Sequence, residues 1–475
     1  MPSRLLKPWL FKPLGAAAAV IALAAGGSVA EDAARIQPCA STEYTASIPG
    51  GAPKGPVPDR LTIVLVGDAG FNPNGAAVAP EGFRDKQGAL LNFGESLSGI
   101  AREVDGDLAF INLETVITDR NDLVADSKGQ TAPYNFMSHP LALKALVGTG
   151  FNLFSLANNH SMDYGANGAE ETLYHMAVTA AERPIAYAGI GTNFEEATRP
   201  GCLEVNGTRL AFGATGIVTG QREEHRAGDD KTGQASYRNP KDFELVVNRL
   251  VELPADYRIL SIHYGLEGRV VPDQRQLKEW RGFAAREKGI DLIVGHHPHV
   301  AQGVERAGNS LIFYGLGNFL HPGTAEMTRF GVCRDYGLMA KVHLAKLEGD
   351  WKVEAIEAIP LTKTHMRPER FPVQQSVTRI YALNHLGAQL GDGRTSEGVR
   401  FTPRQDGSGL YCTPGAETLG GRVGALCTGW QPAPAIPKKL SRQLASACQD
   451  KPFYGAVSTQ KRRKTNSFWD GFGPR

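Results

Sequence analysis

Short runs of apolar and β-branched residues, each followed by Asp, Glu, Asn or His, recur along the middle of the chain. Stretches with helical periodicity separate several of these runs, and the alternation over about 250 residues predicts an α/β fold with much parallel sheet. Ligands of such folds bind at the carboxyl ends of the strands, so the polar residues there are the first candidates for a functional site. The predicted strands are 61–66, 108–111, 151–156, 209–213, 258–262, 290–295 and 311–314, and the predicted helices are 89–104, 141–147 and 274–288.

The stretch 290–300 carries the densest group of polar residues. Three of the twelve histidines of the chain, His296, His297 and His299, follow its strand. In extended backbone, residues two apart point to the same side, so His297 and His299 are expected to face one way. Pro298 between them restricts the backbone. Neutral imidazoles at a strand end are typical ligands of a transition metal, and a histidine-rich surface loop is the alternative.

Four other strand ends supply further donors, namely Asp68, Glu114, the pair Asn159 and His160, and His263. Taken singly, each has a structural explanation, such as a turn, a helix cap, a solvated carboxylate or a core histidine. Taken with His297 and His299, they are seven oxygen and nitrogen donors from five strand ends. Mixed donors without thiolates predict a pair of divalent ions rather than one structural zinc.

Six motifs in this region occur together and in order: Gly67-Asp68, Asn112-Leu-Glu114, the run from Leu156 to Gly165, His263-Tyr-Gly-Leu-Glu267, Gly295-His-His-Pro-His-Val300 and Tyr314-Gly-Leu-Gly-Asn-Phe319. They resemble the motifs of the capsule-synthesis CapA (poly-γ-glutamate biosynthesis) family, which belongs to the calcineurin-like metallophosphoesterases. The resemblance runs from about residue 61 to residue 361. It implies a four-layer α/β/β/α sandwich with two divalent metal ions, of Mn, Zn, Fe or Mg, at the strand ends.

The resemblance also implies roles for single residues. His160 would face the leaving group as a general acid, with Asp163 orienting its ring. Two ions would activate water and clamp the attacking and leaving oxygens of a phosphoryl transfer. The implied ligands are Asp68 and His299 for the first ion, Glu114 between the ions, and Asn159, His263 and His297 for the second.

Several assignments stay open at this point. The spacing of His296, His297 and His299 does not rank them as ligands, because this motif has one residue more than the usual Gly-His-x-His. Gly70 stands where the superfamily has a histidine two residues after the first aspartate, which implies a thinner shell for the first ion. The pocket is expected to include Asn112, Asn158, Glu267, His296 and Asn318, although Glu267 could equally be a surface carboxylate and Asn318 a turn residue. Four histidines outside the motifs, His139, His175, His225 and His321, are expected at the surface.

The first thirty residues are typical of an export signal. Arg4, Lys7 and Lys12 precede an apolar run at 14–25, and Ser28-Val-Ala30 is a small-x-small cleavage site. The apolar run is short for a membrane span, so we expect cleavage after Ala30, with a retained membrane anchor as the alternative. Cleavage removes three positive charges and changes the net charge from +2 to −1, which indicates no nucleic-acid partner.

The chain of 475 residues is expected to divide into a signal peptide at 1–30, a linker at 31–60, a CapA-type metallophosphatase-like domain at 61–365 and a C-terminal extension of unknown role at 366–475. Its six cysteines all follow the signal and form no CxxC pair. In an exported protein they predict disulfides. The basic run 461–464 is expected to be solvated, with contact to an anionic polymer or lipid headgroups as the alternative.

Two functions fit these features. A hydrolase in the periplasm or cell envelope would cleave a phosphoester or another bond in a surface polymer or its precursor. A non-catalytic partner would bind an anionic polymer such as poly-γ-glutamate during export or attachment, within a capsule-synthesis membrane complex. The pair His160 and Asp163 favours hydrolysis, because binding alone needs no general acid.

Overall fold

The computed structural model describes residues 36–38, 60–71, 77–79, 82–84, 90–128, 133–205, 207–217, 223–286, 289–321 and 330–450. The predicted signal peptide at 1–30 and the basic run at 461–464 lie outside these residues. Within the described ranges, no helix has both the length and the apolar character needed to cross a membrane.

The first sheet has eight strands in the order β1-β11-β12-β14-β15-β17-β16-β22. Its parallel centre consists of β12 (Thr208–Gly216), β14 (Tyr257–His263), β15 (Leu292–His296) and β17 (Ser310–Phe313), which confirms the four strands predicted there. The flanking strands are antiparallel: β1 (Ile36–Pro38), β11 (Gly201–Val205), β16 (Val304–Ala307) and β22 (Ser396–Gly398). Part of the predicted linker 31–60 thus extends this sheet as β1.

The second sheet has ten strands along the path β23-β24-β20-β19-β2-β5-β8-β9, with β18 beside β2 and β21 beside β20. Its parallel strands are β2 (Arg60–Ala69), β5 (Leu108–Leu113), β8 (Leu153–Ser155), β9 (Ala186–Ala188) and β18 (Asn318–Leu320). Three of them were predicted. The antiparallel strands were not: β19 (Gly337–Leu347), β20 (Asp350–Thr362), β21 (Glu369–Arg370), β23 (Thr402–Pro403) and β24 (Gly409–Cys412).

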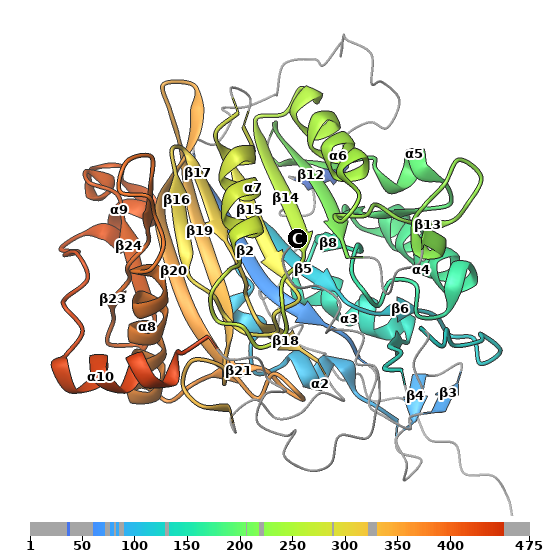
Figure 1. Cartoon of the computed structure of the whole chain (residues 1–475), viewed down its shortest axis with the longest axis horizontal. Coiled ribbons are helices and arrows are strands. Elements are labelled where there is room, and N and C mark those ends of the chain that lie inside the picture. Colours follow the sequence, from blue (N-terminus) through green and yellow to red (C-terminus); the bar gives the residue numbers. More distant parts are fainter. Residues whose placement is uncertain are drawn as a thin grey trace, which may run out of the picture.

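Alternating side chains of the strands divide the apolar residues among three layers. Between the sheets, Phe110 of β5 contacts Phe212 of β12 edge to face, with ring centroids 5.7 Å apart. The outer face of the second sheet packs on α2 (Phe93–Leu97), α3 (Pro140–Thr149) and α4 (Gly165–Glu182), and the outer face of the first sheet packs on α6 (Pro240–Glu252) and α7 (Gln274–Ala284). Figure 1 shows α6 and α7 lying over β12, β14 and β15. These three cores confirm the four-layer α/β/β/α sandwich.

The predicted helices differ in extent from those of the structure. The helix predicted at 89–104 is only α2 followed by a 3-10 turn, η1 (Ala101–Glu103). The Ser98 hydroxyl donates to the Glu95 carbonyl at 2.8 Å, a local bond that competes with continuation of the helix. The helix predicted at 141–147 is confirmed as α3, and the one at 274–288 is α7, which ends at Ala284.

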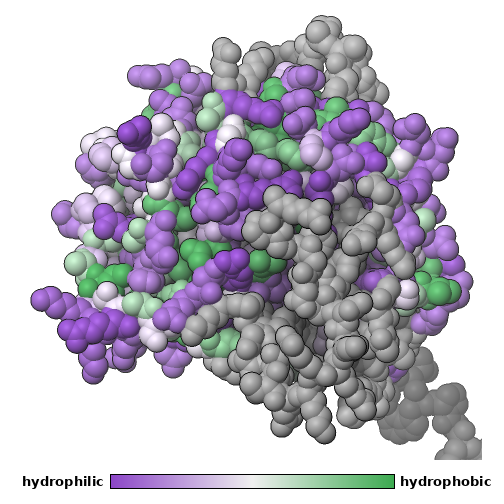
Figure 2. Space-filling view, in the orientation of Figure 1, coloured by the Kyte–Doolittle hydropathy of each residue, from purple (hydrophilic) through white to green (hydrophobic). Residues whose placement is uncertain are grey.

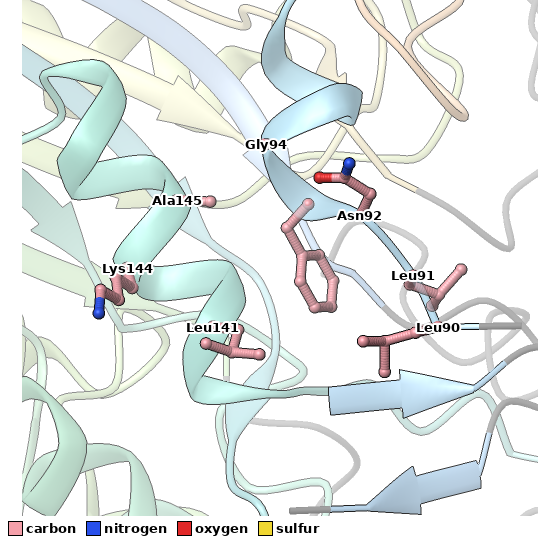
Figure 3. Close-up of a pocket in the computed structure, with 8 residues that line it drawn as sticks. Leu90, Leu91, Asn92, Gly94, Leu141, Lys144 and Ala145 are labelled. Atoms are coloured by element: carbon pink, nitrogen blue, oxygen red, sulfur yellow. The ribbon is translucent and has the colours of Figure 1, made fainter. Parts of the chain in front are cut away.

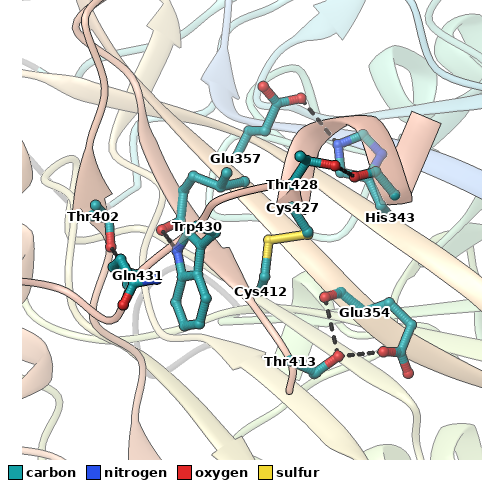
Figure 4. The surroundings of a disulfide bond; sticks show 12 residues. His343, Glu354, Glu357, Thr402, Cys412, Thr413, Cys427, Thr428, Trp430 and Gln431 are labelled. Carbon is teal, nitrogen blue, oxygen red and sulfur yellow. Dashed lines mark hydrogen bonds and ion pairs between the residues drawn. A yellow bond between two sulfur atoms is a disulfide. The ribbon is translucent and has the colours of Figure 1, made fainter. Parts of the chain in front are cut away.

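The described part of the predicted C-terminal extension 366–475 contributes β22 to the first sheet and β21, β23 and β24 to the second. Helix α8 (Val373–Gly387) packs on β16 and β20, α10 (Lys438–Ala447) packs on α8, and α9 (Gly421–Cys427) packs on β20 (Figure 1). Disulfides join Cys333 to Cys448 and Cys412 to Cys427 (Figure 4), and Cys202 is also disulfide-bonded. Among the described residues, the inner core thus includes side chains from both sides of residue 365, and the division of the chain at that point stays a prediction.

Shorter elements complete the description: β3 (Ala77–Ala79), β4 (Gly82–Arg84), β6 (Val116–Ile117), β7 (Met137–Ser138), β10 (Ile190–Gly191), β13 (Gly233–Gln234), α5 (Phe194–Ala197), η2 (Glu223–His225) and η4 (Ala416–Thr418). On the face seen in Figure 2, hydrophilic residues predominate and the hydrophobic ones form small separate groups. A pocket of about 490 Å³ lies between the segment 90–94 and helix α3, where Leu90, Leu91, Leu141, Lys144 and Ala145 are among the lining residues (Figure 3). It holds none of the predicted site residues.

Candidate metal centre

The carboxyl ends of strands from both sheets meet at one place. Asp68 at the end of β2 is in register with Asn112 of β5 and Asn318 of β18, and His263 of β14 is in register with His296 of β15. The approach of β18 to β2 depends on Gly67, since a Cβ there would lie 1.7 Å from the Gly317 carbonyl oxygen. The Asp68 amide donates to that oxygen at 3.0 Å.

Glu114 lies at the centre of this cluster and is fully buried. Neither of its carboxylate oxygens accepts a hydrogen bond from the described residues. Imidazole nitrogens surround it instead, at distances that leave space between the groups. They are those of His321 at 3.4 Å, His263 at 3.5 Å, His160 at 3.9 Å and His299 at 4.0 Å. A buried carboxylate without hydrogen bonds, ringed by imidazoles, fits a cation between them.

Two sets of candidate ligands share Glu114. One set adds His297 and His299, and the other adds Asp68 and His263; within each set, one ligand atom per residue lies within 4.8 Å of the others. A third set, Asp119, Glu171 and His175, lies at the surface away from this cluster. Carboxylate and imidazole donors suit divalent ions such as Mn, Zn or Fe.

The charges of the cluster are coupled. Burial alone raises the pKa of Asp68, but hydrogen bonds from His296 and His299 outweigh it and hold that pKa well below its usual range. Burial and the neighbouring charge of Asp68 raise the pKa of Glu114. Burial lowers the pKa of His299, yet Glu114 and Asp68 together raise it to about 10. Two carboxylates in a dry site thus attract positive charge strongly.

The expectation that His297 and His299 lie in extended backbone is wrong. Strand β15 ends at His296, and the φ angles of His297 and His299 are 92° and 57°. Non-glycine residues seldom adopt positive φ, so this turn is a strained one held by its surroundings. Their rings still lie close together, with centroids 6.0 Å apart.

The structure separates the three histidines that spacing left unranked. The ring of His296 stacks on Phe110 of the inner core, and its Nδ1 lies 3.1 Å from Asp68. His299 Nδ1 lies 2.9 Å from Asn318 Oδ1 and 3.2 Å from Asp68, and His297 belongs with it in the ligand set around Glu114. His296 is therefore placed to orient Asp68, while His297 and His299 face Glu114.

On the other side of the cluster, His263 Nε2 lies 2.6 Å from Asn159 Oδ1. Asn112 donates to Asp68 at 2.8 Å and lies 3.2 Å from His263 Nδ1, so it ties the two predicted ligands together. Asn158 donates to the Leu113 carbonyl at 2.9 Å, a contact within the supporting loops. Burial lowers the pKa of His263 well below its usual range, and that of His297 to about 3. Both rings are thus neutral, as metal ligands must be.

His160 Nδ1 lies 2.7 Å from Asp163 Oδ2, the contact that the family resemblance implied for this pair. Its ring packs on Phe136 with centroids 4.1 Å apart. Burial, together with the charge of Lys128, holds the pKa of His160 well below its usual range, whereas burial raises the pKa of Asp163 to about 7. Lys128 forms an ion pair with Asp163 Oδ1. Sequence reasoning missed this lysine, which stands in a loop without periodicity.

Other outlying residues also differ from expectation. The surface placement predicted for His139, His225 and His321 is wrong, because all three are buried. His139 accepts from the Leu141 amide at the start of α3, and His225 lies 3.0 Å from an Asp126 oxygen. His321 is the histidine nearest to Glu114, and only its closeness to the Asn318 motif hinted at this.

The two uncertain pocket residues both lie near His299. Asn318 contacts it directly, and the charge of half-buried Glu267 helps to raise the pKa of His299. At Gly70, where a histidine was missing from the pattern, an added Cβ would lie 3.0 Å from the Glu114 carbonyl oxygen. The backbone is therefore too close there for a larger residue without a shift.

Comparison with known proteins agrees with the motifs. Residues 62–322 match the family described as bacterial capsule synthesis protein PGA_cap. The chain is 34% identical over 183 residues to the capsule biosynthesis protein CapA of Bacillus anthracis. The aligned region covers 38% of this chain and 42% of that protein. It is 31% identical over 262 residues to the PGA biosynthesis protein CapA of Bacillus subtilis (strain 168), which covers 53% of this chain and 63% of that protein.

The match thus spans less than two thirds of the length of either relative. Among solved structures, the chain is similar to the calcineurin-like phosphoesterase YfkN from Bacillus subtilis, with 14% identity and a TM-score of 0.34 over 68% of this chain and 96% of that chain. Because the family match covers more than half of the chain, the protein belongs to the bacterial capsule synthesis protein PGA_cap family.

Proposed function

We propose that the protein is an exported, metal-dependent hydrolase that cleaves a phosphoester or another bond in an anionic cell-envelope polymer or its precursor. The observation that carries this proposal is the buried Glu114 carboxylate, which accepts no hydrogen bond from the described residues while four imidazoles surround it. In a core with a purely structural role, a buried carboxylate would be hydrogen-bonded or would be replaced by an apolar side chain.

Two divalent ions are proposed, held by Asp68, Glu114, Asn159, His263, His297 and His299. When bound, they would supply Lewis acidity towards an oxyanion and lower the pKa of water. Asn112 and His296 would keep Asp68 in place through the contacts already described. His321 is a further nitrogen donor beside Glu114.

His160 would donate a proton to the leaving oxygen as a general acid. Its Nδ1 faces Asp163, which leaves Nε2 on the side of Glu114. The low pKa of the buried ring means that it is neutral until a negatively charged substrate enters. Substrate charge then favours the protonated ring, which donates from Nε2 to the departing oxygen.

Export, the polymer and the partners are also proposals. The signal-like residues 1–30 and the disulfides Cys333–Cys448 and Cys412–Cys427 support an oxidising compartment, the periplasm or cell envelope. The relatives named for capsule and PGA biosynthesis support an anionic polymer as substrate and a capsule-synthesis membrane complex as partner.

A second candidate is a non-catalytic protein that binds the anionic polymer through the same metal centre. The family description, which names capsule synthesis and no hydrolysis, favours this candidate. It predicts metal binding without turnover.

The test is metal analysis of the mature protein by mass spectrometry beside hydrolysis of phosphomonoester and phosphodiester probes with manganese or zinc. The variant His297→Ala/His299→Ala removes two proposed ligands, and His385→Ala on α8 is the control outside the cluster. Two equivalents of metal and turnover, both lost only in the double variant, support the hydrolase. Metal without turnover supports the polymer-binding protein, and no metal under any loading condition refutes both.

A further inference from the structure

Lys128 carries an ammonium group inside the protein, beside His160 and Asp163. Its side chain is 4% exposed. Nζ forms an ion pair with Asp163 Oδ1, donates to the Tyr134 carbonyl at 2.7 Å and lies 3.3 Å from His160 Nδ1. A buried ammonium is tolerated only when it is paired and hydrogen-bonded. These contacts therefore account for its position.

Hydrogen bonds of Asp126 and Lys128 hold the segment that carries Lys128. Lys128 has a φ of 49°, a left-handed conformation that its neighbours must maintain. Its amide donates to Asp126 Oδ1 at 2.5 Å, and the Asp126 amide donates to the Asp163 carbonyl at 2.8 Å. The second Asp126 oxygen lies 3.0 Å from His225 Nε2. The position of the ammonium group beside Asp163 thus depends on hydrogen bonds that hold the backbone at Asp126 and Lys128, and not on the flexible side chain alone.

The two oxygens of Asp163 have separate partners. Oδ1 faces Lys128, while Oδ2 accepts from the Phe136 amide at 2.5 Å and lies 2.7 Å from His160 Nδ1. An ionised carboxylate can only accept, and this 2.7 Å contact is shorter than the 3.3 Å between Nδ1 and the Lys128 ammonium, so Nδ1 carries the hydrogen towards Asp163. The Nε2 lone pair of His160 is then directed to the side where Glu114 lies 3.9 Å away.

We propose that Lys128 is a positioning residue: by holding the Asp163 carboxylate it fixes His160 with Nδ1–H towards Asp163 and Nε2 towards the metal centre. The effect of Lys128 on catalysis rests on the proposed hydrolase function, whereas its effect on which nitrogen of the His160 ring carries the hydrogen does not. Without the ammonium, buried Asp163, whose pKa is already raised to about 7, takes up a proton. It then donates to Nδ1, and the ring hydrogen moves to Nε2.

The direct test is nitrogen NMR of histidine side chains in the full chain, labelled with ¹⁵N-histidine and loaded with zinc as a diamagnetic metal. His160→Gln identifies the His160 signals. Lys128→Met removes the charge at similar length, Lys128→Arg keeps it, and Lys144→Met changes an exposed lysine of α3 as a control. The wild type, Lys128→Arg and Lys144→Met are expected to show a pyrrole-like Nδ1, and Lys128→Met a pyridine-like Nδ1.

A kinetic test on a phosphodiester probe follows. Lys128→Met is expected to lower kcat by about tenfold or more, with KM changed less than about twofold, because proton transfer by a positioned side chain is what the lysine supports. Lys128→Arg restores most of kcat, and metal content is unchanged in both.

The outcomes separate the two proposals. An unchanged Nδ1 signal in folded Lys128→Met overturns the positioning role, whatever the activity. A wild type that shows the expected ring state but no turnover refutes the hydrolase and leaves the positioning role intact. If Lys128→Met does not fold, the His160 signals of the wild type decide the question. A wild-type ring that carries its hydrogen on Nε2 overturns the proposal.

Discussion

Replacing Glu114 with glutamine tests the metal centre most directly, because it keeps the shape of the side chain and removes its charge. Both oxygens of Glu114 lie in the gap between histidines of the two candidate ligand sets, 3.4 to 4.0 Å from four imidazole nitrogens. At a separation of about 4 Å and an effective dielectric constant of about 20, a pair of unit charges interacts with about 4 kcal/mol. A loss of about 4 kcal/mol corresponds to roughly a thousandfold weaker binding, and a divalent ion loses more.

The assay is calorimetric titration of the metal-free protein with manganese or zinc, beside thermal unfolding with and without metal. In the wild type, metal at a hundred times its Kd adds about 2.7 kcal/mol of stability. In Glu114→Gln this gain is expected to vanish at the same metal concentration. Glu348→Gln, whose side chain is 90% exposed on the β19–β20 turn, is the matched control and should respond as the wild type. Metal affinity of Glu114→Gln within about tenfold of the wild type would refute the reasoning.

Three further predictions concern the frame around the centre. Cys412→Ala/Cys427→Ala removes a disulfide that closes a loop with a sequence separation of 15, and it should lower the free energy of unfolding by about 3 kcal/mol, as measured in urea. The metal content should not change, because this disulfide contributes nothing to the metal centre, and a loss of metal would contradict that reasoning. Gly67→Ala places a Cβ 1.7 Å from the Gly317 oxygen and should destabilise by more than about 3 kcal/mol, whereas Gly282→Ala, with open space around it in α7, should be neutral or stabilising; equal urea midpoints would refute this packing. Burial raises the pKa of Asp291 from 3.8 to about 6, so its ionisation opposes folding increasingly between pH 4 and pH 6; Asp291→Asn should recover up to about 3 kcal/mol above pH 6 and none below pH 4, and a pH-independent difference would contradict the assignment.

Local patterns were sufficient to predict most of the parallel strands and the types of donor residue at their ends. The runs at 61–66, 258–262 and 290–295 are apolar on both faces because helices cover one side and the other sheet covers the other, and such runs are visible in the sequence. The order of polar residues after each run needs no knowledge of contacts. Asp68 and Glu114, which lie at the ends of the adjacent parallel strands β2 and β5, could therefore be proposed as neighbours, whereas the approach of His263 from the other sheet was implied only by the family resemblance.

Contacts between distant segments could not be predicted in this way. The β19–β20 hairpin and the strands β21, β23 and β24 pair antiparallel in the second sheet, and β22 pairs antiparallel in the first, where a register shift of one residue would change which side chains are buried. Lys128 reaches Asp163 through a loop without periodicity, and His321 reaches Glu114 from the end of β18.

The sequence by itself determined the fold class, the donor types and most candidate ligands, because strand periodicity and residue order encode them locally. Only the tertiary structure decided that His297 and His299 lie in left-handed backbone, that His296 contacts Asp68, and that Glu114 lies among imidazoles without accepting a hydrogen bond from the described residues. The physical reason is that burial, charge coupling and backbone strain arise from packing of the two sheets together. No single segment contains that information.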